Sequence, residues 1–248
     1  MLRYFIKLAY KGTDFHGWQI QPNADSVQER IETALSILLK NPIEIVGAGR
    51  TDTGVHASEY FAHFETDQKI DEFEISHKLN ALLPLTITIY KIFKVQNDLH
   101  ARFSALNRSY SYQILLENNP FLLDTTWQLP QRNFDVLRMN EAAKILLKHT
   151  DFKAFSKSKT DVNNYFCTIK EAYWTLEKNQ LTFHITANRF LRNMVRAIVG
   201  TLLDVGNGKI TVPEFEQIIL SKNRSEAGLS VPAKGLFLTK INYDELDF

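Results

Sequence analysis

The sequence Gly47-Ala48-Gly49-Arg50-Thr51-Asp52-Thr53-Gly54-Val55-His56-Ala57 forms a glycine-rich connection between two segments that have the composition of strands. Residues 43–46 precede it and residues 58–65 follow it. Its three glycines permit backbone angles that other residues avoid, so the connection can hold a side chain in an exposed, strained position. The carboxylate of Asp52 is therefore a candidate nucleophile or base, with Arg50 two residues before it.

Other uses of a glycine-rich loop also fit parts of this stretch. Such glycines often only turn the chain, and composition alone leaves that use open. A dinucleotide-binding fingerprint needs a third glycine at position 52, and a P-loop needs a Lys-Ser/Thr pair that is absent here. The triplet Asp52-Thr53-Gly54 also occurs in aspartic proteases, but that chemistry needs two carboxylates sharing a proton, and the chain has no second such triplet.

The composition is that of an ordinary globular protein. The chain has 248 residues, 44% hydrophobic and 23% charged, with a formal net charge of +1, so net charge gives no argument for a nucleic-acid partner. Residues 104–248 hold 18 Lys and Arg against 15 Asp and Glu, so the basic excess lies in the second half.

The cysteine and histidine content argues against a metal or disulfide protein. Cys167 is the only cysteine, which excludes an intramolecular disulfide and a cysteine-based zinc site. The seven histidines include no His-x-x-x-His pair on a predicted helix, so no metal is expected. No apolar run approaches the roughly 20 residues of a membrane span, and a reducing cytoplasm is the expected compartment.

The first half of the sequence predicts the order β-α-β-β-α-β. Arg3–Tyr10 is rich in aromatic and β-branched residues, as strands are. Ser26 and Glu29 have the spacing of a capping box, and the helix that follows is expected to end at Asn41-Pro42. After the two strands around the Asp52 loop, a helix is expected over Ile75–Leu83 and a strand over Leu85–Val95.

The second half predicts a similar order with weaker boundaries. The expected elements are a strand with Tyr110, Tyr112, Ile114 and Leu116 alternating, a helix over Phe134–Lys148, a hairpin of Phe166–Glu177 and Leu181–Ala187, helices over Phe190–Leu203 and from Thr211, and a strand over Leu236–Ile241. Two split β-α-β units in tandem indicate an α+β protein with two ferredoxin-like halves joined into one mixed, mostly antiparallel sheet with a central cleft. The expected halves are residues 1–103, with the Asp52 loop, and 104–248, with an arginine-bearing helix.

Three arginines recur around the predicted helix Phe190–Leu203. Arg189, Arg192 and Arg196 have the spacing i, i+3 and i+7, so they are expected along one side of it. Such a row is often only a solvated face. Arg196, however, lies between apolar residues and needs an anion, either a protein carboxylate such as Asp52 or a phosphate.

Two tyrosines of the strand that follows Arg108 are candidate base-stacking groups. Tyr110 and Tyr112 alternate, so both are expected on one face of the strand. Core packing is the commoner use of such tyrosines. Against RNA the same pair can stack on an unpaired base while neighbouring arginines bind phosphate.

Several segments together resemble one family, the TruA-type tRNA pseudouridine synthases, and they follow the family's order over nearly the whole chain. The segments are Tyr10–Thr13 with Phe15–Gln19, Gly49–Ala57, Leu79–Pro84, His100–Ala105 with Arg108–Tyr112, Met194–Arg196 with Ile198–Gly200, and Pro232–Leu238. Lys11 stands where the family commonly has Asp, and Lys234 stands at a position that varies; neither belongs to the proposed acid–base set.

The resemblance implies an activity and a set of roles. The implied activity is conversion of uridine to pseudouridine in the anticodon stem-loop of tRNA (positions 38–40), by a homodimer that needs no cofactor. Asp52 resembles the nucleophilic aspartate, Tyr110 the tyrosine that stacks on the target base, and Arg196 the arginine paired with the aspartate. Leu236 resembles a residue lining the base pocket, and Arg50 the arginine that enters the target stem when the base leaves it.

A second hypothesis belongs to another class. Split β-α-β halves also build non-catalytic RNA-binding proteins, which carry stacking aromatics but need no carboxylate in a glycine-rich loop. Attack on the base at C6 and assistance to departure of the base from the ribose stay equally open. The expected specificity loops, residues 157–164 and the 120s, carry no readable pattern.

Overall fold

The structure is a computed structural model that describes residues 1–157 and 164–244. Most of the expected specificity loop, residues 158–163, lies outside the described residues. By its internal contacts the chain divides into two compact units, unit 1 with residues 1–106 and 237–248, and unit 2 with residues 107–236. The division into functional halves at residues 103/104 stays a prediction.

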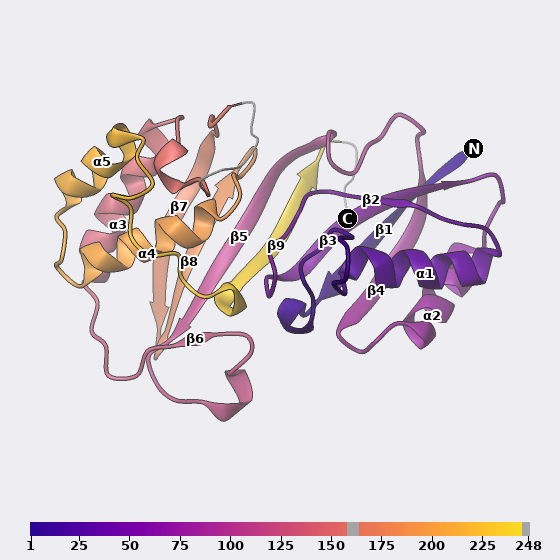
Figure 1. Cartoon of the computed structure of the whole chain (residues 1–248), viewed down its shortest axis with the longest axis horizontal. Helices are drawn as coiled ribbons and strands as arrows, with labels where there is room; N and C mark the ends of the chain where they lie inside the picture. Colours follow the sequence, from indigo (N-terminus) through magenta and orange to yellow (C-terminus); the bar gives the residue numbers. More distant parts are fainter. Residues whose placement is uncertain (158–163, 245–248) are drawn as a thin grey trace. The chain divides into compact units, whose positions relative to one another are not determined.

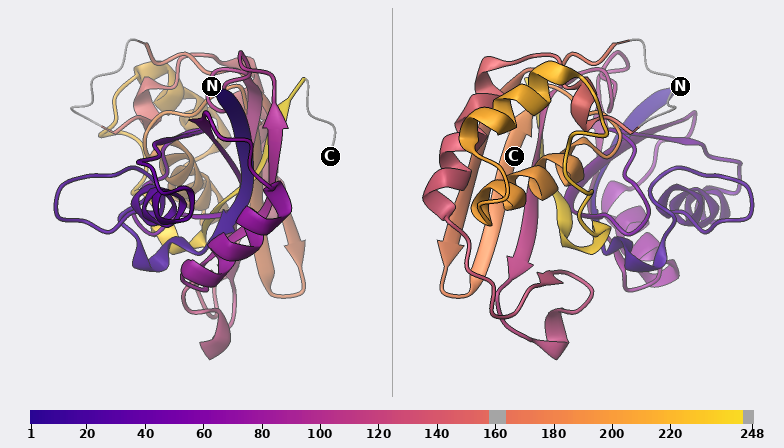
Figure 2. Two further views of the ribbon diagram at one scale, coloured as in Figure 1. Left: turned by 90° about the vertical axis from the view of Figure 1, so that its right-hand side faces the viewer. Right: turned by 60° about the vertical axis from the view of Figure 1, so that its left-hand side comes forward.

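Unit 1 contains a sheet with two helices. Its strands follow the order β4-β1-β3-β9, with β2 paired to β3. β1 is antiparallel to β3 and β4, whereas β9 runs parallel to β3. The helices α1 and α2 lie on the same face of this sheet (Figures 1 and 2). The elements are β1 (Leu2–Tyr10), α1 (Val27–Leu39), β2 (Ile45–Gly47), β3 (His56–Thr66), α2 (Glu72–Leu82), β4 (Ile87–Val95) and β9 (Leu236–Tyr243).

Local side-chain caps set the helix ends in unit 1. The Ser26 side chain accepts a hydrogen bond from Glu29 N, as the sequence predicted, and Lys40 ends α1 in the left-handed conformation. α2 begins three residues before the predicted Ile75, because the Asp71 side chain accepts from Glu74 N and caps the helix there.

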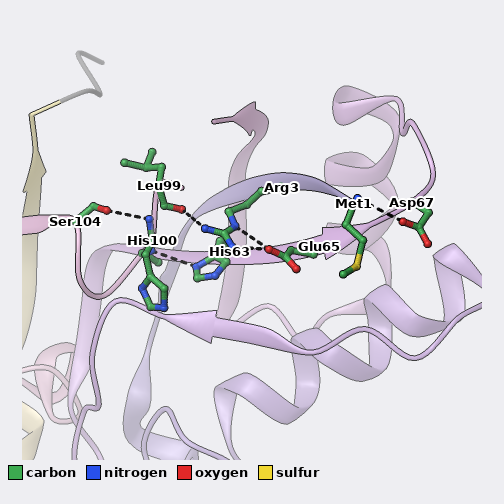
Figure 3. A network of polar contacts seen from close by, with 9 residues as sticks. Met1, Arg3, His63, Glu65, Asp67, Leu99, His100 and Ser104 are labelled. Atoms are coloured by element: carbon green, nitrogen blue, oxygen red, sulfur yellow. Dashed lines mark hydrogen bonds and ion pairs between the residues drawn. The ribbon is translucent and has the colours of Figure 1, made fainter. Parts of the chain in front are cut away.

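Within unit 1, side chains of β1 and β3 form hydrogen bonds to the loop that follows β4 (Figure 3). Arg3 forms an ion pair with Glu65 and donates through Nη1 to the Leu99 carbonyl at 2.9 Å. His63 Nδ1 accepts from Ala101 N at 3.1 Å, and the His63 ring stacks on Phe5. The loop is therefore held against β1 and β3 by these bonds.

We expect His63 to make the stability of this protein fall in mild acid. Burial, and next His100 and Arg3, lower the pKa of His63 from 6.5 to about 4. As pH falls below 6.5 the unfolded chain takes up a proton that the folded chain refuses until about pH 4, so folding stability is lost over that window. Between pH 7.5 and 5.0 this amounts to about 1–2 kcal/mol, discounted for solvent screening.

The measurement is urea unfolding of the wild type and of His63→Asn at both pH values. Asparagine keeps an acceptor for Ala101 N but does not titrate. The variant is expected to lose less stability on acidification than the wild type, whatever its stability at pH 7.5. Equal losses in the two proteins would contradict the prediction.

Unit 2 is a three-strand antiparallel arrangement, β5-β8-β7, with the short β6 parallel to β5. The helices α3, α4 and α5 pack on one another and lie on one face of these strands (Figures 1 and 2). The elements are β5 (Ala105–Leu115), β6 (Trp127–Gln128), α3 (Val136–Ile145), β7 (Ile169–Glu177), β8 (Gln180–Ala187), α4 (Met194–Gly206) and α5 (Val212–Ser221).

The sequence predicted α5 well and the start of α4 badly. Thr211 and Glu214 form the predicted capping box, with Pro213 in the first turn. The predicted helix from Phe190 is wrong at its beginning, because Asn193 adopts a left-handed conformation (φ +66°) and α4 starts only at Met194. Arg189 and Arg192 therefore precede the helix and do not share a helical face with Arg196.

The fold class is confirmed. The described residues form an α+β protein with mixed, mostly antiparallel strand pairing, and unit 1 has the predicted β-α-β-β-α-β order. None of the helices among the described residues has the length and apolar character needed to cross a membrane.

Candidate active site

The Asp52 loop of unit 1 is anchored to β3 on its N-terminal side. Ala48 N donates to the Phe61 carbonyl at 2.9 Å. Gly49 N donates to the Tyr60 hydroxyl at 3.2 Å, and that hydroxyl donates back to the Gly49 carbonyl. The Tyr60 ring in turn stacks on Trp18, with ring centroids 4.1 Å apart. The loop is thus tied to the core before it reaches Asp52.

Beyond Asp52 a tight turn returns the chain to β3. Val55 N donates to the Asp52 carbonyl at 3.1 Å, and Gly54 takes the positive φ of +76° that the turn requires. The buried Thr51 hydroxyl lies 2.9 Å from the Tyr10 hydroxyl at the end of β1. The residues on both sides of Asp52 are therefore fixed.

The segment 11–18 packs against the Asp52 loop. This contact leaves no room for a side chain at two of its positions, Gly12 and Gly17. Trp18 N donates to the Thr51 carbonyl at 3.4 Å, and Gly12 N donates to His56 Nδ1 at 3.0 Å. A Cβ at Gly12 would lie 1.9 Å from the Val55 carbonyl oxygen, and one at Gly17 would lie 2.3 Å from the Thr51 oxygen. The backbone of segment 11–18 is thus in direct contact with the backbone of the Asp52 loop, with no room for a side chain between them.

Replacing Gly17 with alanine is expected to destabilise the protein by about 2–4 kcal/mol and to lower its activity. Gly17 has φ +91°, and the new methyl group would collide with the residue next to Asp52. Gly49→Ala is the matched control, because a Cβ there meets nothing within 4 Å and its φ is not positive. Thermal melts and activity assays of both variants test this; equal stability of the two would contradict it.

On this fixed loop Asp52 is half-buried, while Arg50 and Thr53 are exposed. The loop thus presents one carboxylate at the protein surface with a guanidinium two residues away, as the sequence predicted for this stretch. The packing of the loop holds the backbone of Asp52 in one position, which is the pre-organisation that a nucleophilic carboxylate needs.

In unit 2 the two candidate tyrosines of β5 have different surroundings. Tyr112 is fully buried, and its hydroxyl donates to the Pro232 carbonyl at 2.8 Å. Burial raises the pKa of Tyr112, while the charge of nearby Arg196 opposes that shift. Tyr110 is half-buried, and its ring meets the Phe190 ring edge-on at 5.1 Å. Of the two tyrosines, only Tyr110 is partly exposed.

Phe190 contacts the candidate residue Tyr110, and sequence reasoning missed it. It lies between β8 and α4, where the sequence predicted the first turn of a helix. Its edge-to-face contact supports the ring of Tyr110. Only the observed pairing of β5 with β8, and the chain's course after β8, bring these two rings together.

Arg196 and Leu236 lie near Tyr112 in the same unit. Arg196 Nε donates to the Val231 carbonyl at 2.7 Å, and Val231 N donates to the Arg196 carbonyl at 3.3 Å. Leu236 is buried and follows a single 3-10 turn, Ala233–Gly235. A Cβ at Gly235 would lie 2.8 Å from the Tyr112 ring, so this turn packs directly on β5.

The other candidate arginines lie on separate segments of unit 2. Arg108 Nη1 donates to the Asn188 carbonyl at 3.0 Å. Arg189 Nη1 donates to Asn164 Oδ1 at 3.2 Å, and the Arg192 carbonyl accepts from Lys157 N at 3.1 Å. Arg189 and Arg192 lie in the connection from β8 to α4, and Arg108 contacts Asn188 at the start of that connection.

The described residues contain neither a cluster suited to bind a metal ion nor a reactive cysteine. Within them, no three His, Cys, Asp or Glu side chains are grouped so as to hold a metal ion. Cys167 is a buried free thiol, and burial raises its pKa to about 11. At neutral pH it is protonated, which makes it a poor nucleophile.

Comparison with known proteins covers nearly the whole chain. The model of a family described as tRNA pseudouridine synthase matches residues 8–104 and 142–244. The tRNA pseudouridine synthase A of Parabacteroides distasonis is 50% identical over 246 residues, which are 99% of this chain and 97% of that protein.

Two further relatives match a similar share of the chain at lower sequence identity. The tRNA pseudouridine synthase A of Bacteroides thetaiotaomicron is 48% identical over 248 residues, 99% of this chain and 92% of that protein. That of Bacillus licheniformis is 38% identical over 247 residues, 98% of this chain and 100% of that protein. Because both the family match and the identities extend along the chain, it belongs to the tRNA pseudouridine synthase family.

Proposed function

We propose that this chain isomerises uridine to pseudouridine in the anticodon stem-loop of tRNA (positions 38–40), with Asp52 as the nucleophile. The observation that carries the proposal is the fixed loop around Asp52, in a chain whose relatives carry the name tRNA pseudouridine synthase A. The reaction breaks the bond between N1 and the ribose and forms a bond from C5 to the same carbon. The C5 proton is lost and N1 gains one, so the product is an isomer and no redox cofactor is needed.

Each candidate residue has a role in this proposal. The target base leaves its stem, at a cost of a few kcal/mol, and stacks on Tyr110. Arg196 is proposed to pair with the Asp52 carboxylate, and Leu236 to give the base pocket an apolar wall. Arg50, exposed on the same loop as Asp52, enters the stem where the base has left.

Tyr112 has a different role from the one the sequence indicated. Its buried ring and its bond to the Pro232 carbonyl support a role in holding the segment before Leu236, not in stacking on RNA. Arg108, Arg189 and Arg192 are proposed to bind tRNA phosphates. Affinity for tRNA should then fall steeply as salt rises, since each such contact releases counterions.

The remaining parts of the proposal concern the assembly and its location. The protein acts as a homodimer on tRNA in the cytoplasm, and its chemistry needs no metal. These statements are part of the proposal, and what the resemblance to the family implies supports them.

The test gives the purified protein an unmodified tRNA that carries tritium at C5 of uridine. Release of the label to water, with modified sites mapped by carbodiimide treatment and primer extension, is the expected result at positions 38–40. Tight tRNA binding without label release would overturn the proposal in favour of a non-catalytic RNA-binding protein. Label released only from uridines outside the anticodon stem-loop would overturn the assigned site.

A further inference from the structure

A segment of unit 2 between α5 and the last 3-10 turn, residues 223–231, is here called the strap. In Figure 1 it leaves α5 and runs past α4. The Val231 carbonyl at its end accepts from Arg196 Nε, and Val231 N donates to the Arg196 carbonyl. The strap therefore fixes both the backbone and the first guanidinium nitrogen of Arg196.

The strap lies in direct backbone contact with α4. A Cβ at Gly200 would lie 1.9 Å from the Leu229 carbonyl oxygen, so only glycine fits there. Gly228 N donates to Thr201 Oγ1 at 2.9 Å, and that hydroxyl donates to the Ala197 carbonyl one turn earlier. A shift of the strap thus changes the position of Val231 relative to the helix that carries Arg196.

The path of the strap is held from inside by Arg224. Arg224 Nη1 donates to the carbonyls of Ala227 and Gly228 at 3.2 and 3.1 Å. Its Nη2 donates to Ser230 Oγ at 2.9 Å. Within the described residues Arg224 forms no ion pair with a carboxylate, and burial lowers its pKa. The guanidinium serves to bind neutral oxygens of the strap, which a planar fork of donors does well.

Ser230 connects this arrangement to the start of α4. Its Oγ also accepts from Asn193 Nδ2 at 2.5 Å, and Asn193 is the left-handed residue that precedes the helix. Arg224, Ser230 and Asn193 therefore tie the strap to the first turn of α4, three residues from Arg196. Inside unit 2, Nη1 and Nη2 of Arg196 donate to none of the described residues, so both remain for an anion.

We propose that Arg224 is a positioning residue for the isomerisation: by fixing the strap it sets the Val231 carbonyl, which orients the guanidinium of Arg196. This inference rests on the proposed function, in which Arg196 acts on Asp52. Arg224 itself touches neither the base nor the carboxylate, and acts only through Arg196.

The experiment measures single-turnover label release, tRNA affinity and melting temperature for Arg224→Gln. The rate is expected to fall about 10–30-fold with affinity within about twofold, because a small displacement of a charged group is costly in the transition state. Arg138→Gln is the matched control. That exposed arginine of α3 pairs with Asp135 at the helix start, and its loss should leave the rate unchanged.

A double-mutant cycle with Arg196→Lys separates positioning from general damage. Lysine keeps a charge but cannot form the Nε bond to Val231. If Arg224 acts through Arg196, the variant R196K/R224Q is about as slow as R196K alone. If R224Q slows R196K by the same factor as it slows the wild type, or leaves the wild-type rate unchanged, the inference is overturned.

A second variant covers the case in which R224Q does not fold. Ser230→Ala removes the acceptor that Arg224 and Asn193 share and leaves the guanidinium in place. Its rate is expected to fall about 3–10-fold, again without effect in the R196K background. An inactive wild type would overturn the proposed function itself, whereas an active wild type with unaffected R224Q and S230A rates overturns only this inference.

Discussion

Asp52→Asn is expected to lose pseudouridine formation by a factor of at least about 10³, because the amide cannot serve as the nucleophile. Affinity for tRNA should stay within a few-fold of the wild type, since the substitution removes no donor that binds phosphate. Melting temperature should change little, because backbone bonds of Thr51, Gly54 and their neighbours, and the Thr51 hydroxyl, hold the loop. The measurement is single-turnover release of label from C5 of uridine with enzyme in excess.

Thr53→Ala is the control for this substitution. Thr53 is exposed in the same turn and has no role in the proposed chemistry. Its rate should equal that of the wild type. An Asp52→Asn protein that retains a tenth or more of the wild-type rate would refute the assignment of the nucleophile.

Arg196→Met is expected to lower the same rate by about 10²–10³-fold, with a smaller loss of tRNA affinity. Methionine preserves the apolar part of the side chain but removes the cation that, in our proposal, pairs with the Asp52 carboxylate and orients it. It also leaves the Val231 carbonyl without its 2.7 Å donor. Rate and affinity are measured separately, by label release at saturating enzyme and by filter binding.

The control variant for Arg196 is Lys209→Met, which removes an exposed cation of unit 2 that pairs with Asp204. It should match the wild type in rate. If Arg196→Met reduces affinity alone and leaves the rate at saturation intact, Arg196 is a phosphate-binding residue and does not act on Asp52.

Local signals predicted the elements whose ends are set by neighbouring residues. The capping box of Thr211 and Glu214 involves side chains three residues apart, so the local sequence alone predicts the start of α5. The Asp52 loop was predicted for a similar reason, because its glycines and flanking strands are contiguous. Asp71 has the same capping role, yet the prediction began at Ile75 because the apolar pattern begins there.

Features that depend on distant contacts were missed. The left-handed Asn193 interrupts a run whose apolar spacing continues without a break, so nothing local separates Arg192 from Arg196. Tyr110 and Tyr112 fit the same alternating pattern, and contacts with the distant residues Pro232 and Gly235 accompany the burial of Tyr112. Arg224 gives no signal because its acceptors are neutral oxygens of its own loop.

The buried, protonated state of Cys167 makes this chain convenient for site-specific labelling. Maleimides react with thiolates, so a cysteine introduced at an exposed position such as Thr53 will couple to a dye well before the native thiol does. A fluorophore placed there needs no cysteine-free background. Its emission would follow docking of tRNA in real time, next to the residue proposed to begin the reaction.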